Sequence, residues 1–337
     1  MDQGQGRNIN ILLTSVGRRV ELVRAFQRAY ERLHLEGAVI GVDLDPLAPA
    51  LNLVDKMYVV PGVLSPVYIS TLMRIIQRER VNLVFPLIDP DIPVLAANMS
   101  ILESGGAKLC VVPIQSVKIV NDKWETAKFF RKLRLETPRT WLPSEIDPLK
   151  PGFPAFIKPR GGSAAKNAFK VHNRKELEFF LEYVPNPILQ EFVSGPEITT
   201  DVACTCEGEI LSIVSRKRIE VRWGEVSKGV TVCDKRIIEA CIQIARSLPA
   251  HGPITVQCIM NNDLPVFTEI NARLGGGVPL GIAAGADSPM FLLARAAGIE
   301  VDLPRIGDYK TGLYMTRYDD SYFLEESDVA DIRSRGI

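Results

Sequence analysis

The sequence predicts an α/β protein, in which an N-terminal domain with a parallel sheet is followed by a larger α+β part made of two subdomains. Over roughly residues 8–115, short apolar runs alternate with helical patterns, as is typical of a parallel sheet covered by helices. After Pro113 this alternation gives way to proline-punctuated segments and to strands rich in Ile and Val. The length of 337 residues also exceeds what one hydrophobic core usually serves. We expect an N-terminal domain over residues 1–115, a small subdomain over 116–190 and a central subdomain over 191–337.

Composition narrows the function classes before any motif is considered. Forty Lys and Arg residues balance forty Asp and Glu residues without a long run of either sign, so we do not expect a nucleic-acid partner. The N-terminus is polar and no apolar run is long enough to cross a bilayer, so we expect no membrane association. The six cysteines include no Cys-x-x-Cys pair and indicate a reduced, cytoplasmic protein. The three separated histidines do not predict a zinc site.

The N-terminal domain is predicted to begin with a strand, a glycine turn and a helix. Residues 10–15 include an apolar run, Gly17 lies in the turn, and apolar residues at helical spacing follow from Val20. Further strands are expected at 38–42, 82–86 and 108–112, and helices at 68–79 and 92–103. Gly17 alone does not make the G-x-G-x-x-G fingerprint, so a nicotinamide-binding domain is only weakly supported. A scaffold is the favoured interpretation.

Ligands of open parallel sheets bind outside the carboxyl ends of the strands, where this sequence places charged side chains. Arg18 and Arg19 follow the first expected strand, and Asp89 follows the strand at 82–86. Adjacent residues diverge by about 100° around a helix, so only one of the two arginines would face a cleft. We select Arg19 to bind a carboxylate substrate, with Asp89 as the partner of an amine. The alternative is that both arginines are solvated charges near the start of a helix.

The second part of the chain is predicted to open with a helix, followed later by a glycine loop. Asp122 is placed to cap the helix, and Glu125 to complete a capping box. Lys158 ends a strand and precedes the small-residue loop 161–165, whose backbone N–H groups could fold over phosphates because glycine permits a close approach. The loop does not match a Walker P-loop, so an ordinary hairpin turn is the alternative.

The segment from Leu189 to Glu197 is a candidate for binding a nucleoside. Extended backbone at residues 191–193 can offer N–H and C=O groups to an adenine edge. The carboxylate of Glu197 can accept hydrogen bonds from ribose hydroxyls. The alternative is a strand that only joins two subdomains.

The most informative stretch is a predicted hairpin over residues 256–273. If residues 262–264 form its loop, Gln257 pairs with Glu269 on one face, and Asn271 lies on that face two residues further on. One carboxylate and two amide oxygens suit Mg²⁺, which takes its remaining ligands from water and phosphates. The alternative is a solvated polar face, which is plausible for Gln257 and less so for the run that starts at Glu269.

Arg273 and the glycines at 275–277 follow directly after this hairpin. They add a permanent cation and a flexible backbone beside the predicted metal site. Such groups can hold a phosphoryl group during its transfer.

Together these motifs resemble the ordered motifs of the ATP-grasp superfamily, and the Gln…Glu-x-Asn set is most similar to the large subunit of carbamoyl phosphate synthase. The resemblance covers nearly the whole chain, including the α/β domain that precedes ATP-grasp modules. It implies ATP and Mg²⁺ as cofactors, with Mn²⁺ as a substitute. The residues that it assigns are Lys123, Lys158, Ser163 and Lys166 at the ATP phosphates, Glu191, Phe192 and Val193 at adenine, Glu197 at ribose, Gln257, Glu269 and Asn271 at the metal, and Arg273 with Lys158 in the transfer itself.

The resemblance implies a ligase that joins a carboxylate to an amine, or to a thiol, through an acyl phosphate and releases ADP and phosphate. The chain holds one such module where the synthase subunit has two, so carbamoyl phosphate synthesis itself is not expected. The expected partners are small-molecule substrates, while a homodimer and a subunit that supplies ammonia are left open. Two alternatives remain, namely a regulatory protein that binds ATP without turnover and a nicotinamide-dependent oxidoreductase.

Overall fold

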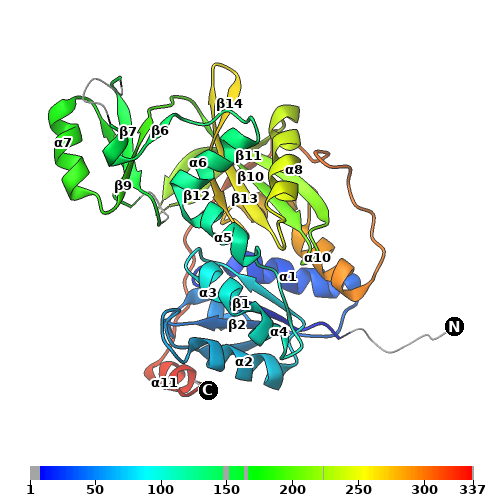
Figure 1. Cartoon of the computed structure of the whole chain (residues 1–337). Helices are drawn as coiled ribbons and strands as arrows, with labels where there is room; N and C mark the ends of the chain where they lie inside the picture. The colour runs from blue at the N-terminus through cyan, green and yellow to red at the C-terminus, as the bar shows by residue number, and fades with distance from the viewer. Residues whose placement is uncertain (1–7, 147–151, 163–165, 223, 336–337) are drawn as a thin grey trace.

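The computed structural model describes residues 8–146, 152–162, 166–222 and 224–335, and these contain three β-sheets (Figure 1). The first is a five-stranded parallel sheet with strand order β3-β2-β1-β4-β5. Its strands are β1 (Ile11–Thr14), β2 (Val39–Asp43), β3 (Lys56–Val59), β4 (Leu83–Pro86) and β5 (Lys108–Leu109). The helices of this domain are α1 (Val20–Leu33), α2 (Tyr68–Glu79), α3 (Asp91–Ala97) and α4 (Met99–Glu103), with a 3₁₀-helix, η1 (Pro49–Asn52). The expected parallel sheet is confirmed.

The central strands of this sheet are largely apolar because both of their faces are buried. Leu12 belongs to one apolar core together with residues of α2, whereas Ile11 and Leu13 belong to a second core together with residues of α1. The sequence pattern does not reveal β3, which lies at the sheet edge and is partly exposed. The expected strand at 108–112 is shorter than predicted, and the expected helix at 92–103 is divided at Asn98.

The second sheet belongs to the small subdomain and is antiparallel, with strand order β6-β9-β7-β8. Its strands are β6 (Thr140–Trp141), β7 (Ala155–Pro159), β8 (Phe169–Val171) and β9 (Pro187–Glu191), accompanied by α7 (Arg174–Tyr183) and a 3₁₀-helix, η2 (Pro143–Glu145). The side chain of Asn173 caps α7 by accepting a hydrogen bond from the N–H of Glu176. An apolar core of its own, which includes Ile157 and Leu189, holds this sheet against the helix.

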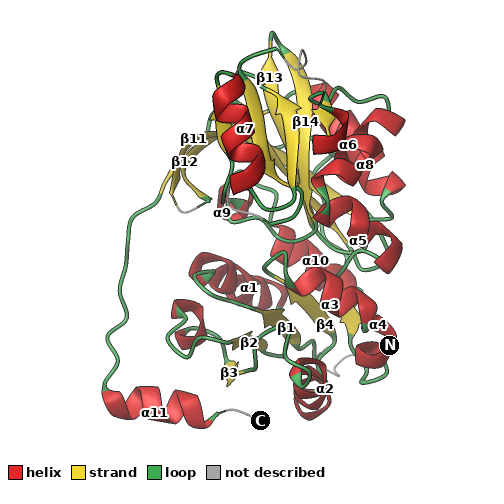
Figure 2. Ribbon diagram, turned by 60° about the vertical axis from the view of Figure 1, so that its left-hand side comes forward, coloured by secondary structure: helices red, strands yellow, loops and turns green. Residues whose placement is uncertain are grey.

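The third sheet is antiparallel and has strand order β14-β13-β10-β11-β12-β15. Its strands are β10 (Glu197–Cys204), β11 (Ile210–Arg222), β12 (Glu225–Val232), β13 (Ile254–Asn261), β14 (Leu264–Asn271) and β15 (Tyr314–Thr316). Helices α5 (Ile114–Asn121), α6 (Lys123–Lys132) and α8 (Lys235–Ser247) share one apolar core with this sheet, while α9 (Val278–Ala283) and α10 (Ser288–Ala297) contact other parts of it (Figure 2). Among the helices that the structure describes, none combines the length and the apolar composition needed to cross a membrane.

The β13–β14 hairpin pairs Gln257 with Glu269, as expected, but by a different route. Its turn consists of two residues, Asn262 and Asp263, whose φ angles are 45° and 62°, so the expected three-residue loop is wrong. A β-bulge between Gln257 and Cys258 then shifts the register by one residue. The shorter turn and the bulge offset each other, and the predicted pair is restored.

The start of α6 differs from expectation in one contact. The side chain of Asp122 caps the helix as predicted, by accepting a backbone N–H of the first turn. The expected capping box is wrong, because the N–H of Asp122 already donates to the carbonyl of Lys118. Glu125 instead forms ion pairs with Lys118 and Lys128. The carboxylate of Asp122 also binds Arg160, which ties this helix to the end of β7.

The expectation that all six cysteines are reduced requires a correction, because Cys110 and Cys206 form a disulfide bond. Cys110 follows β5 of the N-terminal domain, and Cys206 lies between β10 and β11 of the central sheet, 96 positions further along the chain. Sequence spacing carries no sign of this pair, because the docking of the two parts brings the cysteines together.

The C-terminal segment crosses from the central sheet to the N-terminal domain (Figure 2). β15 pairs with β12 at the edge of the six-stranded sheet, and α11 (Glu326–Ser334) contacts β3 at the edge of the parallel sheet. Residues 317–325, here called the C-terminal arm, connect the two and span the junction between the sheets.

Candidate active site

A cleft of about 260 Å³ lies between the N-terminal domain and the central sheet. The carboxyl ends of β1 and β4 lead to Arg19 and Asp89 in its wall, and the central sheet and the loop after it contribute Gln257, Asn271 and Arg273. Residues predicted separately from the N-terminal and the C-terminal parts of the chain therefore line one cavity.

The central sheet presents a polar face to this cleft because side chains alternate along a strand. Neighbouring residues of β13 and β14 point into the apolar core, so Gln257, Glu269 and Asn271 point to the opposite face. In register across four strands, Glu269 pairs with Gln257, Gln257 with Thr199, and Thr199 with Arg216. A row of polar side chains thus crosses the sheet from β14 to β11.

The predicted metal ligands offer one carboxylate and two amide oxygens. Asn271 is buried, and Gln257 and Glu269 are partly exposed. Among the described residues, no group of three or more His, Cys, Asp and Glu side chains is placed to hold a metal ion. This trio is of another kind, because two of its donors are amides. Oxygen donors of this type fit Mg²⁺, which usually keeps waters and takes further ligands from substrate phosphates.

Two lysines from other elements approach Glu269. Lys123 is the first residue of α6, and its Nζ lies 3.7 Å from Oε1 of Glu269 and donates a hydrogen bond to the carbonyl of Gly162. Lys158 lies on β7, and desolvation lowers its pKa to about 8. The negative charge of Glu269 raises the pKa of Lys158, whereas the positive charge of Lys123 lowers it further. A helix, the small sheet and the central sheet therefore bring two cations to one carboxylate.

The segment predicted to bind a base leads from β9 to β10. The backbone N–H of Glu191 donates to the carbonyl of Arg139 at 2.8 Å, and its carboxylate pairs with the Arg139 guanidinium at 3.0 Å. The Nζ of Lys170 lies 4.0 Å from the centroid of the Phe192 ring, a cation–π contact that no motif reveals. The backbone N–H of Glu191 is therefore already hydrogen-bonded to Arg139.

The other residues predicted at the nucleotide have fewer contacts. Glu197 is exposed, and its carboxylate pairs with Arg218 at 3.0 Å. Lys166 is exposed, and Ser163 lies outside the described residues. The structure does not bring the side chains of Glu197 and Lys166 to the cluster around Glu269.

Arg273 joins the two domains across the cleft. Its Nε and Nη2 atoms donate to the two carboxylate oxygens of Asp89, at 2.9 and 3.0 Å. A two-point pair of this kind fixes the plane of the guanidinium group. Asp89, predicted as the partner of an amine, therefore has both oxygens engaged by Arg273.

The glycine loop after Arg273 is tightly packed, so the expected flexible backbone requires a correction. A Cβ on Gly277 would lie 2.1 Å from Nε of Arg216, and a Cβ on Gly276 would lie 2.6 Å from Nη1 of Arg19. No side chain fits at such distances unless the arginines move. The glycines therefore allow two arginines to lie directly against the backbone.

Arg216 organises one side of the cleft. Its side chain is 3% exposed and forms an ion pair with Asp201. Desolvation lowers the pKa of Arg216 to about 9, and the positive charges of neighbouring arginines act in the same direction. A signal for it exists in the sequence, because alternation along β11 places Arg216 and Arg218 on the cleft face and leaves Lys217 exposed.

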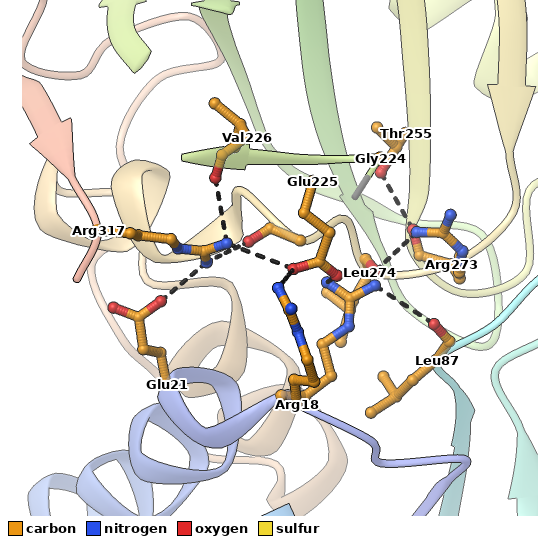
Figure 3. A network of polar contacts seen from close by, with 12 residues as sticks. Arg18, Glu21, Leu87, Gly224, Glu225, Val226, Thr255, Arg273, Leu274 and Arg317 are labelled. Carbon is orange, nitrogen blue, oxygen red and sulfur yellow. Dashed lines mark hydrogen bonds and ion pairs between the residues drawn. The ribbon is translucent and has the colours of Figure 1, made fainter. Parts of the chain in front are cut away.

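Glu225, at the start of β12, gathers three guanidinium groups (Figure 3). Its carboxylate lies 3.1 Å from Arg19, 3.5 Å from Arg317 and 3.7 Å from Arg18. The side chain of Arg19 is 13% exposed, and desolvation lowers its pKa to about 10 although the charge of Glu225 acts in the opposite direction. No sequence motif reveals Glu225, because its partners come from the turn before α1 and from the C-terminal arm.

Two family models match this chain. Residues 120–277 match the ATP-grasp domain, and residues 11–110 match the PylC-like N-terminal domain. The chain therefore carries an ATP-grasp domain, as the sequence motifs predict. The α/β domain in front of it is of the PylC-like type.

Curated relatives match part of the chain. It is 27% identical over 116 residues to a D-alanine–D-alanine ligase of Fusobacterium nucleatum. This alignment covers 34% of this chain and 38% of the relative. It is 26% identical over 191 residues to the 3-methyl-D-ornithine–L-lysine ligase of Methanosarcina mazei. This alignment covers 55% of this chain and 48% of the relative. The chain thus spans half or less of the length of these two proteins.

Solved structures share the fold over most of the chain. An L-amino acid ligase from Bacillus licheniformis aligns with a TM-score of 0.66 and 20% identity, over 87% of this chain and 75% of that one. A biotin carboxylase from Campylobacter jejuni aligns with a TM-score of 0.71 and 16% identity, over 90% of this chain and 74% of that one. At these identities the likeness establishes the fold, and function has to be argued from the site.

Proposed function

We propose that this chain is an ATP- and Mg²⁺-dependent ligase that joins a carboxylate to an amine through an acyl phosphate. The observation that carries the proposal is the convergence of Lys123 and Lys158 on Glu269, beside Gln257 and Asn271. Two ammonium groups next to a set of hard oxygen donors suit a triphosphate together with a divalent cation. The ligase names of the ATP-grasp relatives support the same class of reaction.

Gln257, Glu269 and Asn271 would hold Mg²⁺, or Mn²⁺, which accepts similar ligands, and the bound metal would neutralise charge on the ATP phosphates. Lys123 and Lys158 would bind phosphate oxygens, and Ser163 and Lys166 would add further contacts to the phosphates. Lys158 is partly buried and desolvation lowers its pKa, so water would screen its attraction to phosphate less than at an exposed lysine.

The β9–β10 segment would bind the nucleoside. The N–H of Glu191 donates to Arg139, so the adenine edge would meet the backbone of Phe192 and Val193, with the Glu191 side chain beside it. Glu197 would accept hydrogen bonds from the ribose hydroxyls, and its ion pair with Arg218 would orient the carboxylate.

Two displacements would make up the reaction. First, an oxygen of the substrate carboxylate attacks the γ-phosphorus, the bond to the bridging oxygen breaks, and ADP leaves. Then the amine nitrogen attacks the acyl carbon, the carbon–oxygen bond to phosphate breaks, and the nitrogen releases a proton to solvent. Arg273, held by Asp89, would face the transferring phosphoryl group, and Arg19 would hold the carboxylate. The protein contributes position and charge, which phosphoryl transfer chiefly requires.

An ADP-release assay over a panel of carboxylates and amines tests this proposal. Glu269→Gln removes the charge at nearly constant volume, so we expect Mg²⁺-dependent turnover to fall by on the order of 10²- to 10³-fold while stability is retained. Glu178→Gln, in an exposed ion pair on α7, is the matched control and should keep full turnover. Unchanged turnover in folded Glu269→Gln would reject the metal assignment. If no pair of substrates stimulates ADP release although ATP binds, the protein is instead a nucleotide-binding regulator.

A further inference from the structure

Arg19 is held only weakly by hydrogen bonds of its own, although its side chain is 13% exposed. Its Nη2 atom donates to the carbonyl of Leu87 at 3.5 Å, which is long for a hydrogen bond. Its Nη1 atom is buried without a hydrogen-bond partner among the described residues, and the charge of the Glu225 carboxylate attracts it from 3.1 Å. The orientation of Arg19 therefore depends on the groups that are packed around it.

Two groups in the cleft wall lie directly against Arg19, namely the carboxylate of Glu225 and the backbone of Gly276. A Cβ on Gly276 would lie 2.6 Å from Nη1 of Arg19 and 3.0 Å from Cδ of Glu225, so the glycine backbone contacts both side chains. A movement of this carboxylate or of this backbone would therefore displace the Arg19 guanidinium group.

Arg317, the first residue of the C-terminal arm, binds both of these groups (Figure 3). Its Nη2 atom donates to the carbonyl of Gly276 at 2.5 Å, and its Nη1 atom lies 3.5 Å from Oε2 of Glu225. Nη1 also donates to the carbonyl of Val226 at 3.2 Å, and Nη2 donates to the carboxylate of Glu21 at 2.8 Å. One planar group thus joins α1, the start of β12 and the glycine loop.

The backbone of Arg317 is fixed as well. Its N–H donates to the carbonyl of Ser227 at 2.9 Å, which continues the pairing of β15 with β12. The side chain is 21% exposed and does not line the cleft, whereas Arg19, Glu225 and Gly276 do. Arg317 is therefore placed to act on the cleft through the groups that it holds.

We propose that Arg317 is a positioning residue, which holds Glu225 and the glycine loop so that Arg19 presents its guanidinium group to the substrate carboxylate. The inference rests on the proposed function, in which Arg19 binds that carboxylate. Loss of Arg317 removes one of the guanidinium groups that share Glu225, so this carboxylate is drawn more strongly to the arginines that remain. A closer pair of Arg19 with Glu225 competes with the substrate for the same guanidinium group.

A double-mutant cycle with ADP release as the readout tests the proposal. Arg317→Ala should raise KM for the carboxylate by up to about tenfold, which is the loss expected for Arg19→Ala, and should leave KM for ATP unchanged. In an Arg19→Ala background, Arg317→Ala should raise this KM no further, because its effect passes through Arg19. Arg317→Lys keeps the charge but lacks the planar fork, so it should restore part of the affinity, and it replaces Arg317→Ala in the cycle if that variant does not fold.

Arg32→Ala is the matched control. Arg32 also joins α1 to the later part of the chain, because it pairs with Asp287, the N-cap of α10, at 2.8 Å, but it does not line the cleft. This variant should keep the KM of the parent protein for the carboxylate. An equal rise in Arg32→Ala, an equal rise of KM for ATP in Arg317→Ala, or the same rise in both backgrounds would overturn the proposal and leave the ligase function standing. So would an Arg19→Ala variant with the KM of the parent.

A second readout does not depend on turnover. If no pair of substrates stimulates ADP release, the proposed function fails, and labelling of Arg19 by phenylglyoxal, an arginine-specific reagent, then decides the positioning role. Peptide mass spectrometry measures the rate of labelling. We expect Arg19 to react faster in Arg317→Ala than in the parent protein or in Arg32→Ala, because its guanidinium group is no longer confined. Equal rates in the three proteins would overturn the proposal.

Discussion

Replacing Gly277 with Ala should displace Arg216, because a Cβ at this position would lie 2.1 Å from Nε and 2.5 Å from Cζ of that side chain. Gly277 has a φ of −93°, which any residue can adopt, so the effect is steric. Arg216 is buried against Asp201 and cannot swing away without leaving that carboxylate unpaired. Overpacking of this kind costs about 1–3 kcal/mol of folding free energy. Turnover should fall as well, because Arg216 lines the cleft.

Gly281→Ala is the matched control. A Cβ on Gly281 would meet the side chain of Val214 at 3.6 Å, which is an ordinary contact. Gly281 lies within α9, where Ala is favoured over Gly by roughly 0.5–1 kcal/mol, so this variant should be as stable as the parent protein or more so. Urea unfolding gives the free energy of each variant, and ADP release gives its turnover.

The same change in an Arg216→Ala background separates this clash from other effects. With the guanidinium group removed, Gly277→Ala should add little further loss, so the two changes should be strongly non-additive. Equal losses in both backgrounds, or a Gly277→Ala protein with the stability and turnover of the parent, would refute the reasoning that this glycine exists to admit Arg216.

Three further changes probe the cleft and the domain beneath it. Lys158→Ala should weaken ATP binding more than adenosine binding in calorimetry, because a lysine at the phosphates does not contact the base; equal weakening would indicate a structural role. Arg19→Ala should raise KM for the carboxylate about tenfold and leave KM for ATP unchanged, and steady-state kinetics that show the reverse would remove Arg19 from the carboxylate site. Burial raises the pKa of Asp91 to about 6 despite hydrogen bonds from Thr14 and Ser15, so the folded protein binds more protons than the unfolded chain between about pH 4 and 6. Stability should therefore fall as pH rises through this window, and Asp91→Asn should flatten the dependence in urea unfolding; an unaltered slope would contradict the assignment.

Local pattern was enough to predict much of the fold. The apolar runs of the parallel strands are visible because both faces of those strands are buried, and alternation along β14 places Glu269 and Asn271 on one face. The register of the hairpin is a different matter, because it depends on a turn and a bulge that act together. The pair of Gln257 with Glu269 was predicted from a loop that the structure does not contain.

A strand or a helix repeats its side-chain directions at a fixed spacing. The strands and the faces of their side chains could therefore be predicted from residues that are neighbours in the sequence. The charge pairs that complete the site follow no period. Arg273 meets Asp89 across 184 positions, and Glu225 draws together arginines from the turn before α1 and from the C-terminal arm. These contacts form only when the apolar faces of the two domains dock. The folded chain alone therefore reveals that Arg273 is held by Asp89 and that Arg19 and Arg317 share the carboxylate of Glu225.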